Sequence, residues 1–132
     1  MRKNGLNFTF FILLIILSIG AEASFYSTLN NTEYAYEDLL SDFDLVVLTS
    51  KDCPACKNLQ LKIQKCNIPD NFKIAWVGSK VSKYQFRRNN IEKIKTTEKN
   101  IQKLTQVTPK SILKGHAFKD GVFECNELEK AI

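Results

Sequence analysis

The stretch LVVLTSKDCPAC, residues 45–56, decides how this chain is expected to fold. Its first four residues are all apolar β-formers, the pattern of a strand that is covered on both faces of a sheet. Cys53 and Cys56 follow, with Pro54 between them. A proline is tolerated in the first turn of a helix, because its missing N–H would have no partner there. The stretch therefore predicts a buried strand that leads into a helix with two cysteines at its start.

Downstream of this stretch, the pattern predicts alternating helices and strands. The helix runs over residues 53–65, and residues 72–78 alternate apolar with small or polar residues, as in a strand. Asn89 and Glu92 have the spacing of a capping box, which predicts a helix within the lysine-rich segment 79–96. We therefore expect a basic helical insertion at about residues 79–96.

The last third of the chain predicts a helix, a hairpin and a final helix. Thr97 is placed to cap a helix, which ends before Pro109 because a proline pushes the preceding residue out of the α region. Apolar runs on either side of Asp120-Gly121 predict a β-hairpin, and Asn126 is expected to cap a helix over 127–132. The expected fold class is α/β, with a central mixed sheet of two parallel strands plus a C-terminal hairpin, flanked by helices.

Residues 1–23 are predicted to be a signal peptide. Two basic residues open it, residues 8–19 are almost unbroken apolar sequence, and Ala21-Glu22-Ala23 gives the small residues that a signal peptidase needs before Ser24. The apolar run is shorter than the roughly 20 residues that cross a bilayer as a helix. We therefore expect a periplasmic or otherwise exported protein, with a membrane link only if the leader is retained as an uncleaved anchor.

The remaining residues, 24–132, are of single-domain size and divide into an N-terminal extension, 24–43, and a domain, 44–132. Over the full chain, 19 basic and 14 acidic residues give a formal charge of +5. Residues 24–50 contain acidic residues and no Lys or Arg, whereas residues 51–114 are dense in lysine. Because no arginine-rich run or basic motif interleaved with aromatic residues accompanies the lysines, we interpret them as a solvated face and expect no nucleic-acid partner.

Cys53 and Cys56 suit thiol–disulfide exchange. Unpaired N–H groups and the positive end of the dipole at a helix start favour thiolate over thiol, and only the thiolate attacks a disulfide. Cys56 lies about one turn further in, placed to attack the mixed disulfide that Cys53 forms. Lys51 and Lys57 would support the thiolate, and Asp52 would oppose it. The alternatives are half of a zinc site, which requires a second pair of ligands, and an inert structural bridge. We expect no metal and no cofactor.

The order of a strand, Cys53-Pro54-Ala55-Cys56, a helix and, much later, Thr108-Pro109 before a hairpin resembles the thioredoxin superfamily. Residues 46–56 are similar to glutaredoxins and to the bacterial periplasmic disulfide-bond (Dsb) isomerase group. The resemblance implies a thioredoxin fold in which Cys53 is the nucleophile and Cys56 the resolving thiol of a redox-active disulfide. It also implies that Pro109 is a cis-proline packed opposite the cysteines, and that Thr108 contacts the substrate.

The activity implied is that of an exported protein disulfide oxidoreductase, leaning towards isomerase or reductase. Its partners would be exported proteins that contain cysteines, together with an unidentified redox partner. Asp52 and Val47 stand where cytosolic thioredoxins carry a tryptophan and a buried aspartate. The alternative is a non-catalytic binding or scaffold module of an envelope assembly, such as a secretion or conjugation apparatus, which would use the basic segment 79–96 for docking.

Three further residues carry expectations. In the implied topology, Cys66 lies at the bottom of the sheet and Cys125 at the top beside the active site, beyond the ~7 Å between Cα atoms that a disulfide spans. We therefore expect them to be unbridged, the alternative being a second, structural disulfide. His116, the one histidine of the chain, is expected to be structural or exposed rather than an acid–base catalyst.

Overall fold

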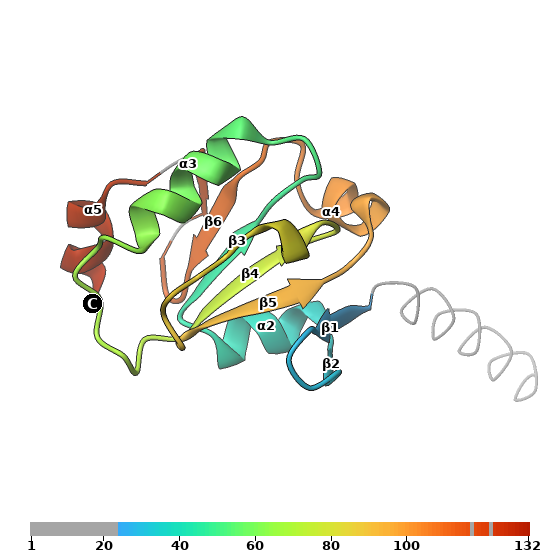
Figure 1. Ribbon diagram of the computed structural model, residues 1–132, viewed down its shortest axis with the longest axis horizontal. Helices are drawn as coiled ribbons and strands as arrows, with labels where there is room; N and C mark the ends of the chain where they lie inside the picture. The colour runs from blue at the N-terminus through green and yellow to red at the C-terminus, as the bar shows by residue number, and fades with distance from the viewer. Residues whose placement is uncertain (1–23, 117, 122) are drawn as a thin grey trace, which may run out of the picture.

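A computed structural model describes residues 24–132 except 117 and 122 (Figure 1). The predicted signal peptide, 1–23, lies outside the described residues. The elements in chain order are β1 (Phe25–Ser27), β2 (Glu33–Tyr34), α2 (Tyr36–Asp42), β3 (Leu45–Leu48), α3 (Pro54–Ile63), β4 (Ile74–Gly78), the 3-10 helix η1 (Val81–Lys83), β5 (Ile91–Lys95), α4 (Glu98–Leu104), β6 (Lys110–Leu113), β7 (Phe118–Asp120) and α5 (Cys125–Ala131).

The strands form one mixed sheet in the order β2-β1-β5-β4-β3-β6-β7. Strands β3, β4 and β5 are parallel, whereas β6 and β7 continue the sheet antiparallel on one side and β1 and β2 do so on the other. The expected α/β class with a mixed sheet is confirmed. The expected arrangement is wrong in two respects, because the parallel part has three strands rather than two and because β1 and β2 add a second antiparallel part.

Helices cover both faces of this sheet (Figure 1). On one face, Val47 of β3 belongs to a cluster with residues of α3 and α5, and on the other face Val46 packs with residues of α2 and α4. All four residues of β3 are buried as a result. The unbroken apolar run predicted this two-sided burial.

The helix predicted within residues 79–96 is absent, and the segment instead contains η1 and strand β5. Ile91 and Ile94, three residues apart, would share one face of a helix, but here they lie on opposite faces of the sheet and in different core clusters. β5 pairs with β4 on one side and β1 on the other. The strand is favoured because both isoleucines are buried, one on each face of the sheet. Its backbone also forms hydrogen bonds with a neighbouring strand on each side. The segment is part of the sheet and not a helical insertion.

The N-terminal extension, 24–43, also belongs to the sheet. β1 pairs with β5 through Tyr26 opposite Lys95, and β2 covers the outer edge of β1. Phe25 and Leu39 are fully buried in the core beneath this edge. The sequence pattern predicts no strands here, because two or three residues are too few to show a period.

The C-terminal hairpin is confirmed, but its turn is not at Asp120-Gly121. β6 and β7 pair antiparallel with Ile112 opposite Phe118, so the turn lies between the two strands, where Gly115 has a positive φ of 80°. α5 then begins one residue earlier than the predicted cap Asn126. Glu124 is its N-cap, and the backbone N–H of Glu124 donates to the Glu127 carboxylate at 2.8 Å.

Candidate functional site

The junction between β3 and α3 holds Cys53 at the N-cap of the helix, and α3 begins with Pro54 as predicted. The Cys53 sulfur accepts a hydrogen bond from the backbone N–H of Cys56 at 3.1 Å, and the Cys53 carbonyl accepts from the same N–H and from that of Lys57. One N–H of the first turn of α3, that of Cys56, therefore reaches the Cys53 sulfur. This is the environment that stabilises a sulfur carrying negative charge.

Cys53 and Cys56 form a disulfide with their Cα atoms 5.2 Å apart. The two cysteines differ in exposure, because Cys53 keeps 8% of its surface accessible and Cys56 keeps none. Of the two cysteines, only Cys53 therefore has surface that a second molecule can reach. The predicted pair is brought together, in its oxidised form.

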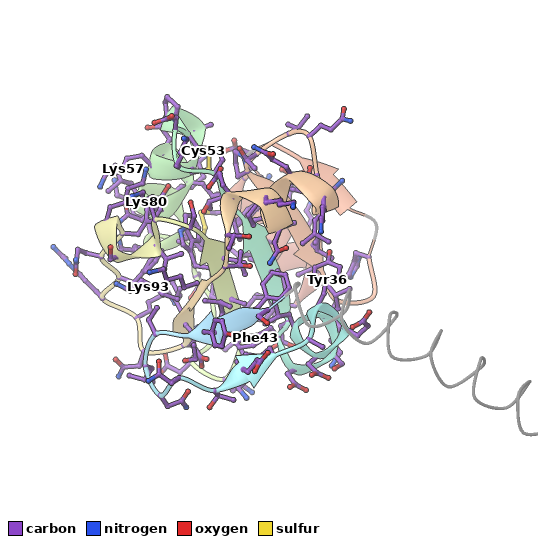
Figure 2. All side chains as sticks on the ribbon, turned by 90° about the vertical axis from the view of Figure 1, so that its right-hand side faces the viewer. Tyr36, Phe43, Cys53, Lys57, Lys80 and Lys93 are labelled. Carbon is purple, nitrogen blue, oxygen red and sulfur yellow. A yellow bond between two sulfur atoms is a disulfide. The ribbon has the colours of Figure 1, made fainter. Side chains whose placement is uncertain are left out.

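A shallow hollow opens at Cys53. Lys83 of η1 reaches into it from a distant part of the chain, and its Nζ donates to the carbonyl oxygen of Lys51 at 2.7 Å. Figure 2 shows Lys57 and Lys80 on the same side of the molecule as Cys53. The hollow is lined by Lys51, Asp52, Cys53, Pro54, Lys57 and Lys83. Sequence reasoning found Lys51 and Lys57 but missed Lys83, because no local pattern connects residue 83 with residue 53.

A carboxylate of α4 fixes the loop that precedes Cys53. One oxygen of Glu98 accepts the backbone N–H of Lys51 at 3.1 Å, and the other accepts the hydroxyl of Ser79. Thr97 caps α4 through the N–H of Asn100, as the sequence predicted. Glu98 thus connects the start of α4 with the loops after β3 and β4.

Tyr84 directly follows η1, and the Nζ of Lys83 lies 5.3 Å from the centre of its ring. It is fully buried and stacks edge-on against Trp76 with ring centroids 5.1 Å apart. Burial raises the pKa of the Tyr84 hydroxyl, and the charge of Glu98 raises it further. Tyr84 therefore adds no negative charge near Cys53 at neutral pH.

Thr108 and Pro109 lie beside the loop that leads to Cys53. The peptide bond between them is cis, as the family resemblance implied. The hydroxyls of Thr108 and Ser50 are hydrogen-bonded at 2.7 Å, and Pro109 directly precedes β6, whose first residue pairs with the last residue of β3. The structure therefore places all four site residues predicted from sequence around the end of one strand.

The ends of β3 and β4 pack against each other without space for a side chain at Gly78. A Cβ atom there would lie 2.2 Å from Oγ1 of Thr49, which itself donates to the carbonyl oxygen of Val77 at 2.9 Å. Only glycine allows this approach. These contacts hold Thr49, the first residue of the loop 49–53, against the end of β4.

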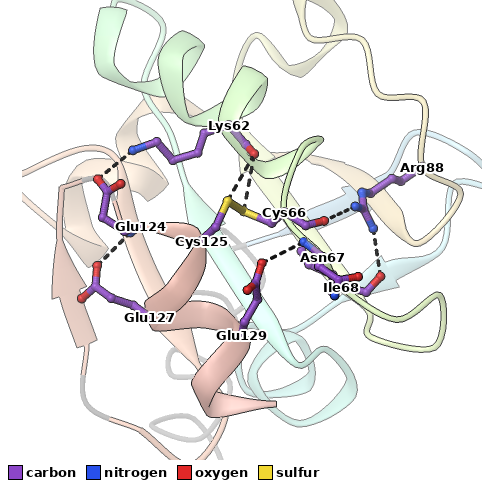
Figure 3. Close-up of a disulfide and its surroundings, with 9 residues drawn as sticks. All are labelled: Lys62, Cys66, Asn67, Ile68, Arg88, Glu124, Cys125, Glu127 and Glu129. Carbon is purple, nitrogen blue, oxygen red and sulfur yellow. Dashed lines mark hydrogen bonds and ion pairs between the residues drawn. A yellow bond between two sulfur atoms is a disulfide. The ribbon is translucent and has the colours of Figure 1, made fainter.

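Cys66 and Cys125 form a second disulfide, with their Cα atoms 5.2 Å apart (Figure 3). The prediction that they are too far apart is wrong. It places Cys125 at the end of the last strand, whereas β7 ends at Asp120 and the chain then returns so that α5 begins beside the C-terminal end of α3. Cys125 is the first residue of α5 and therefore meets Cys66.

Polar contacts surround this second disulfide (Figure 3). Lys62 forms an ion pair with Glu124 at 2.8 Å, and the backbone N–H of Asn67 donates to Glu129 at 2.9 Å. On the opposite side, the guanidinium of Arg88 donates to the carbonyl oxygens of Cys66 and Ile68. The bridge therefore lies within a network that joins α3 to α5 and to the loop before β5.

Two further site hypotheses concern metal binding and His116. Within residues 24–116, 118–121 and 123–132, no three side chains of His, Cys, Asp or Glu are grouped as metal ligands would be. His116 is exposed in the turn between β6 and β7 rather than in a strand. The same described ranges contain no helix long and apolar enough to cross a membrane.

Comparison with known proteins adds no relative. No protein-family model matches the chain, and no curated protein matches it. The function is therefore inferred from the geometry of the two cysteines and their neighbours.

Proposed function

We propose that this chain is a thiol–disulfide oxidoreductase of thioredoxin type that acts on protein disulfides through Cys53 and Cys56. One observation carries the proposal. A disulfide lies at the first turn of α3, and its two cysteines differ: Cys53 keeps a small accessible surface and its sulfur accepts a helix N–H, whereas Cys56 is fully buried. This asymmetry separates the two roles that exchange chemistry requires, an attacking thiol and a resolving thiol.

The thioredoxin assignment is supported by the combination of elements around the disulfide. Parallel strands β3 and β4 flank α3, and the cis peptide before Pro109 precedes the antiparallel strand β6. Thr108 would offer its backbone to a bound substrate, since its side chain is held by Ser50. Such a substrate would then lie across the end of β3, beside Cys53.

The exchange reaction needs no group besides the cysteines and the substrate. In the reduced enzyme, the Cys53 thiolate attacks one sulfur of a substrate disulfide, forms a mixed disulfide and releases the other substrate sulfur as a thiolate. The Cys56 thiolate then attacks the Cys53 sulfur, which releases the second substrate thiolate and regenerates the Cys53–Cys56 disulfide. Two electrons pass from the cysteine pair to the substrate. The reverse sequence oxidises a substrate dithiol.

We propose the isomerase or reductase direction and an oxidising compartment outside the cytosol. Val47 is buried in the core, in the position at which cytosolic thioredoxins carry an aspartate. The compartment is supported by two disulfides in one domain and by the predicted leader 1–23. The substrates would be exported proteins with cysteines, and a separate partner would reduce Cys53–Cys56. The redox potential of the pair, measured against glutathione, tests the direction.

The decisive experiment traps the intermediate. Cys56→Ser removes the resolving thiol, so the reduced variant should accumulate a mixed disulfide with a scrambled exported protein, detectable by non-reducing electrophoresis and mass spectrometry. Cys53→Ser is the matched control and should trap at most about one tenth as much, because Cys56 is buried. Equal trapping by both variants would contradict this division of roles between the two cysteines.

The scaffold alternative rests on an insertion at residues 79–96, but β5 within that segment occupies an interior position of the sheet between β4 and β1. Residues before β5, such as Lys80 and Lys83, are exposed and remain available for docking. A scaffold would keep its function when Cys53 and Cys56 are both replaced by serine, and an enzyme would not. That double variant distinguishes the two.

A further inference from the structure

We infer that the hollow around Cys53 selects substrates whose reactive cysteine is flanked by acidic residues. The inference rests on the proposed function and specifies the substrate of the same site. The partner is a protein segment that brings a cysteine to Cys53 and carboxylates to the lysines around it.

The charge of the hollow is the first support. Three lysines, Lys51, Lys57 and Lys83, line it together with one acidic residue, Asp52. The excess is therefore two positive charges within one shallow depression. Lys80, at the N-cap of η1, is exposed on the same side of the molecule and adds to it (Figure 2).

The lysines are not neutralised by the protein itself. Within the described part of the chain, none of Lys51, Lys57 and Lys83 forms an ion pair, in contrast to Lys62, which is paired with Glu124. The nearby carboxylate of Glu98 accepts the N–H of Lys51 and the hydroxyl of Ser79 and keeps its negative charge, but Lys51, Lys57, Lys80 and Lys83 together outnumber Glu98 and Asp52. The positive charge of the three side chains therefore remains available to a partner.

One lysine is held in position before any substrate binds. Lys83 donates to the carbonyl oxygen of Lys51 at 2.7 Å, and its Nζ lies 5.3 Å from the centre of the Tyr84 ring. η1 thus brings this ammonium group across the sheet to the loop of Cys53. A positioned charge loses less side-chain entropy on binding than a free one.

The disulfide identifies the partner as a thiol-bearing molecule rather than a nucleic acid or a lipid surface. Only a group that reaches the Cys53 sulfur can take part in the exchange, and Cys53 is one of the residues that line the same hollow. Carboxylates on either side of the incoming cysteine would meet the lysines while its sulfur meets Cys53. Opposite charges of this kind raise association rates and are weakened by salt.

The test uses three reduced peptides with a single cysteine, flanked on each side by two aspartates, two lysines or two serines. The oxidised protein is mixed with each peptide, and the loss of the Cys53–Cys56 disulfide is followed by acid quench and mass spectrometry. Flanking charges also alter the reactivity of the peptide thiol itself. Each rate is therefore divided by the rate of the same peptide with an uncharged small disulfide, dithiodipyridine.

We expect the corrected rate for the aspartate peptide to exceed that for the lysine peptide by about tenfold at low salt, and by less than about twofold at 1 M salt, where the Debye length is about 3 Å. The variant Lys51→Gln, Lys57→Gln, Lys83→Gln should reduce the low-salt ratio to about one. Using the ratio within each protein cancels any change in the intrinsic reactivity of Cys53.

A matched variant removes the same charge elsewhere. Lys65, Lys73 and Lys103 are exposed and lie outside the hollow, and their replacement by glutamine should leave the ratio near tenfold. If the ratio falls equally in this control, or if it does not change with salt concentration, the inference is wrong. Neither result would contradict the proposed oxidoreductase activity. If neither the peptides nor an uncharged thiol such as mercaptoethanol opens the Cys53–Cys56 disulfide, the proposed function itself fails.

Discussion

The two disulfides lie at opposite ends of α3 and differ in the length of chain that each one closes. Cys53–Cys56 closes a single turn at the start of the helix, with a sequence separation of 3. Cys66–Cys125 joins positions 59 residues apart and ties the end of α3 to the start of α5. The first disulfide therefore closes a loop of one helical turn, whereas the second closes a loop that contains about half of the described residues.

The polar side chains around the two disulfides also differ. The first disulfide borders a hollow with unpaired lysines, and the second is enclosed by the Lys62–Glu124 pair and by contacts of Glu129 and Arg88. A bond that must open and close is most useful where it costs the fold little and a partner can reach it. A bond that stabilises the fold is most useful where it closes a long loop.

The largest expected difference between the two bonds is in reactivity. Limited dithiothreitol should reduce Cys53–Cys56 at least about tenfold faster than Cys66–Cys125, because the N–H of Cys56 and the lysines of the hollow stabilise the Cys53 thiolate that leaves, whereas the sulfurs of the second bond lie near the carbonyl oxygen of Lys62. Alkylation followed by mass spectrometry identifies which pair has opened. Faster opening of Cys66–Cys125 would reverse the roles of the two bonds.

The reduced Cys53 thiol should also react with iodoacetamide below the pH range of an ordinary cysteine thiol, whose pKa is about 8.5. The N–H of Cys56 and the lysines of the hollow favour its thiolate form. The rate of labelling is measured as a function of pH, with reduced glutathione as the reference thiol. A profile that coincides with that of glutathione would argue against an activated nucleophile.

Next in size is the difference in stability. On the chain-entropy model, removing the Cys66–Cys125 bridge by a double alanine substitution should lower the free energy of unfolding by about 4 kcal/mol, and removing Cys53–Cys56 in the same way by about 2 kcal/mol. Chemical denaturation of the two double variants measures both values. Equal losses would show that loop length does not distinguish the bonds.

The close contact between Gly78 and Thr49, next to the loop that leads to Cys53, should have a smaller effect on the free energy of unfolding. Gly78→Ala places a Cβ against Oγ1 of Thr49 and should cost about 1–3 kcal/mol of unfolding free energy. In a Thr49→Ala background the clash is gone, so the same glycine substitution should cost at least about 1 kcal/mol less. A double-mutant cycle by denaturation measures the coupling, and additive costs would contradict the contact.

The smallest expected effect concerns the ion pair beside the second disulfide. Lys62→Gln removes the charge that faces Glu124, whose side chain is 66% exposed. Since water screens such pairs, the loss of unfolding free energy should be below about 1 kcal/mol. A loss as large as that of removing Cys66–Cys125 would show that the bridge is secondary to its polar surroundings.

Much of the candidate site could be predicted because it is local in sequence. The buried run 45–48 and the helix that begins at Pro54 follow from apolar pattern and from proline geometry within one short stretch. The capping role of Thr97 likewise follows from its position before an apolar repeat. Thr108-Pro109 came from family resemblance, and the structure has the cis bond at that position.

The sequence by itself thus determined the strand and helix that present Cys53 and Cys56, since neighbouring residues alone set those dihedral angles and that burial. Only the tertiary structure decided that Ile91 and Ile94 belong to a strand, because pairing with β4 and β1 outweighs a helical spacing of three. It also decided that Cys125 meets Cys66. Contacts between distant segments depend on where each turn redirects the chain, and no local period records that direction.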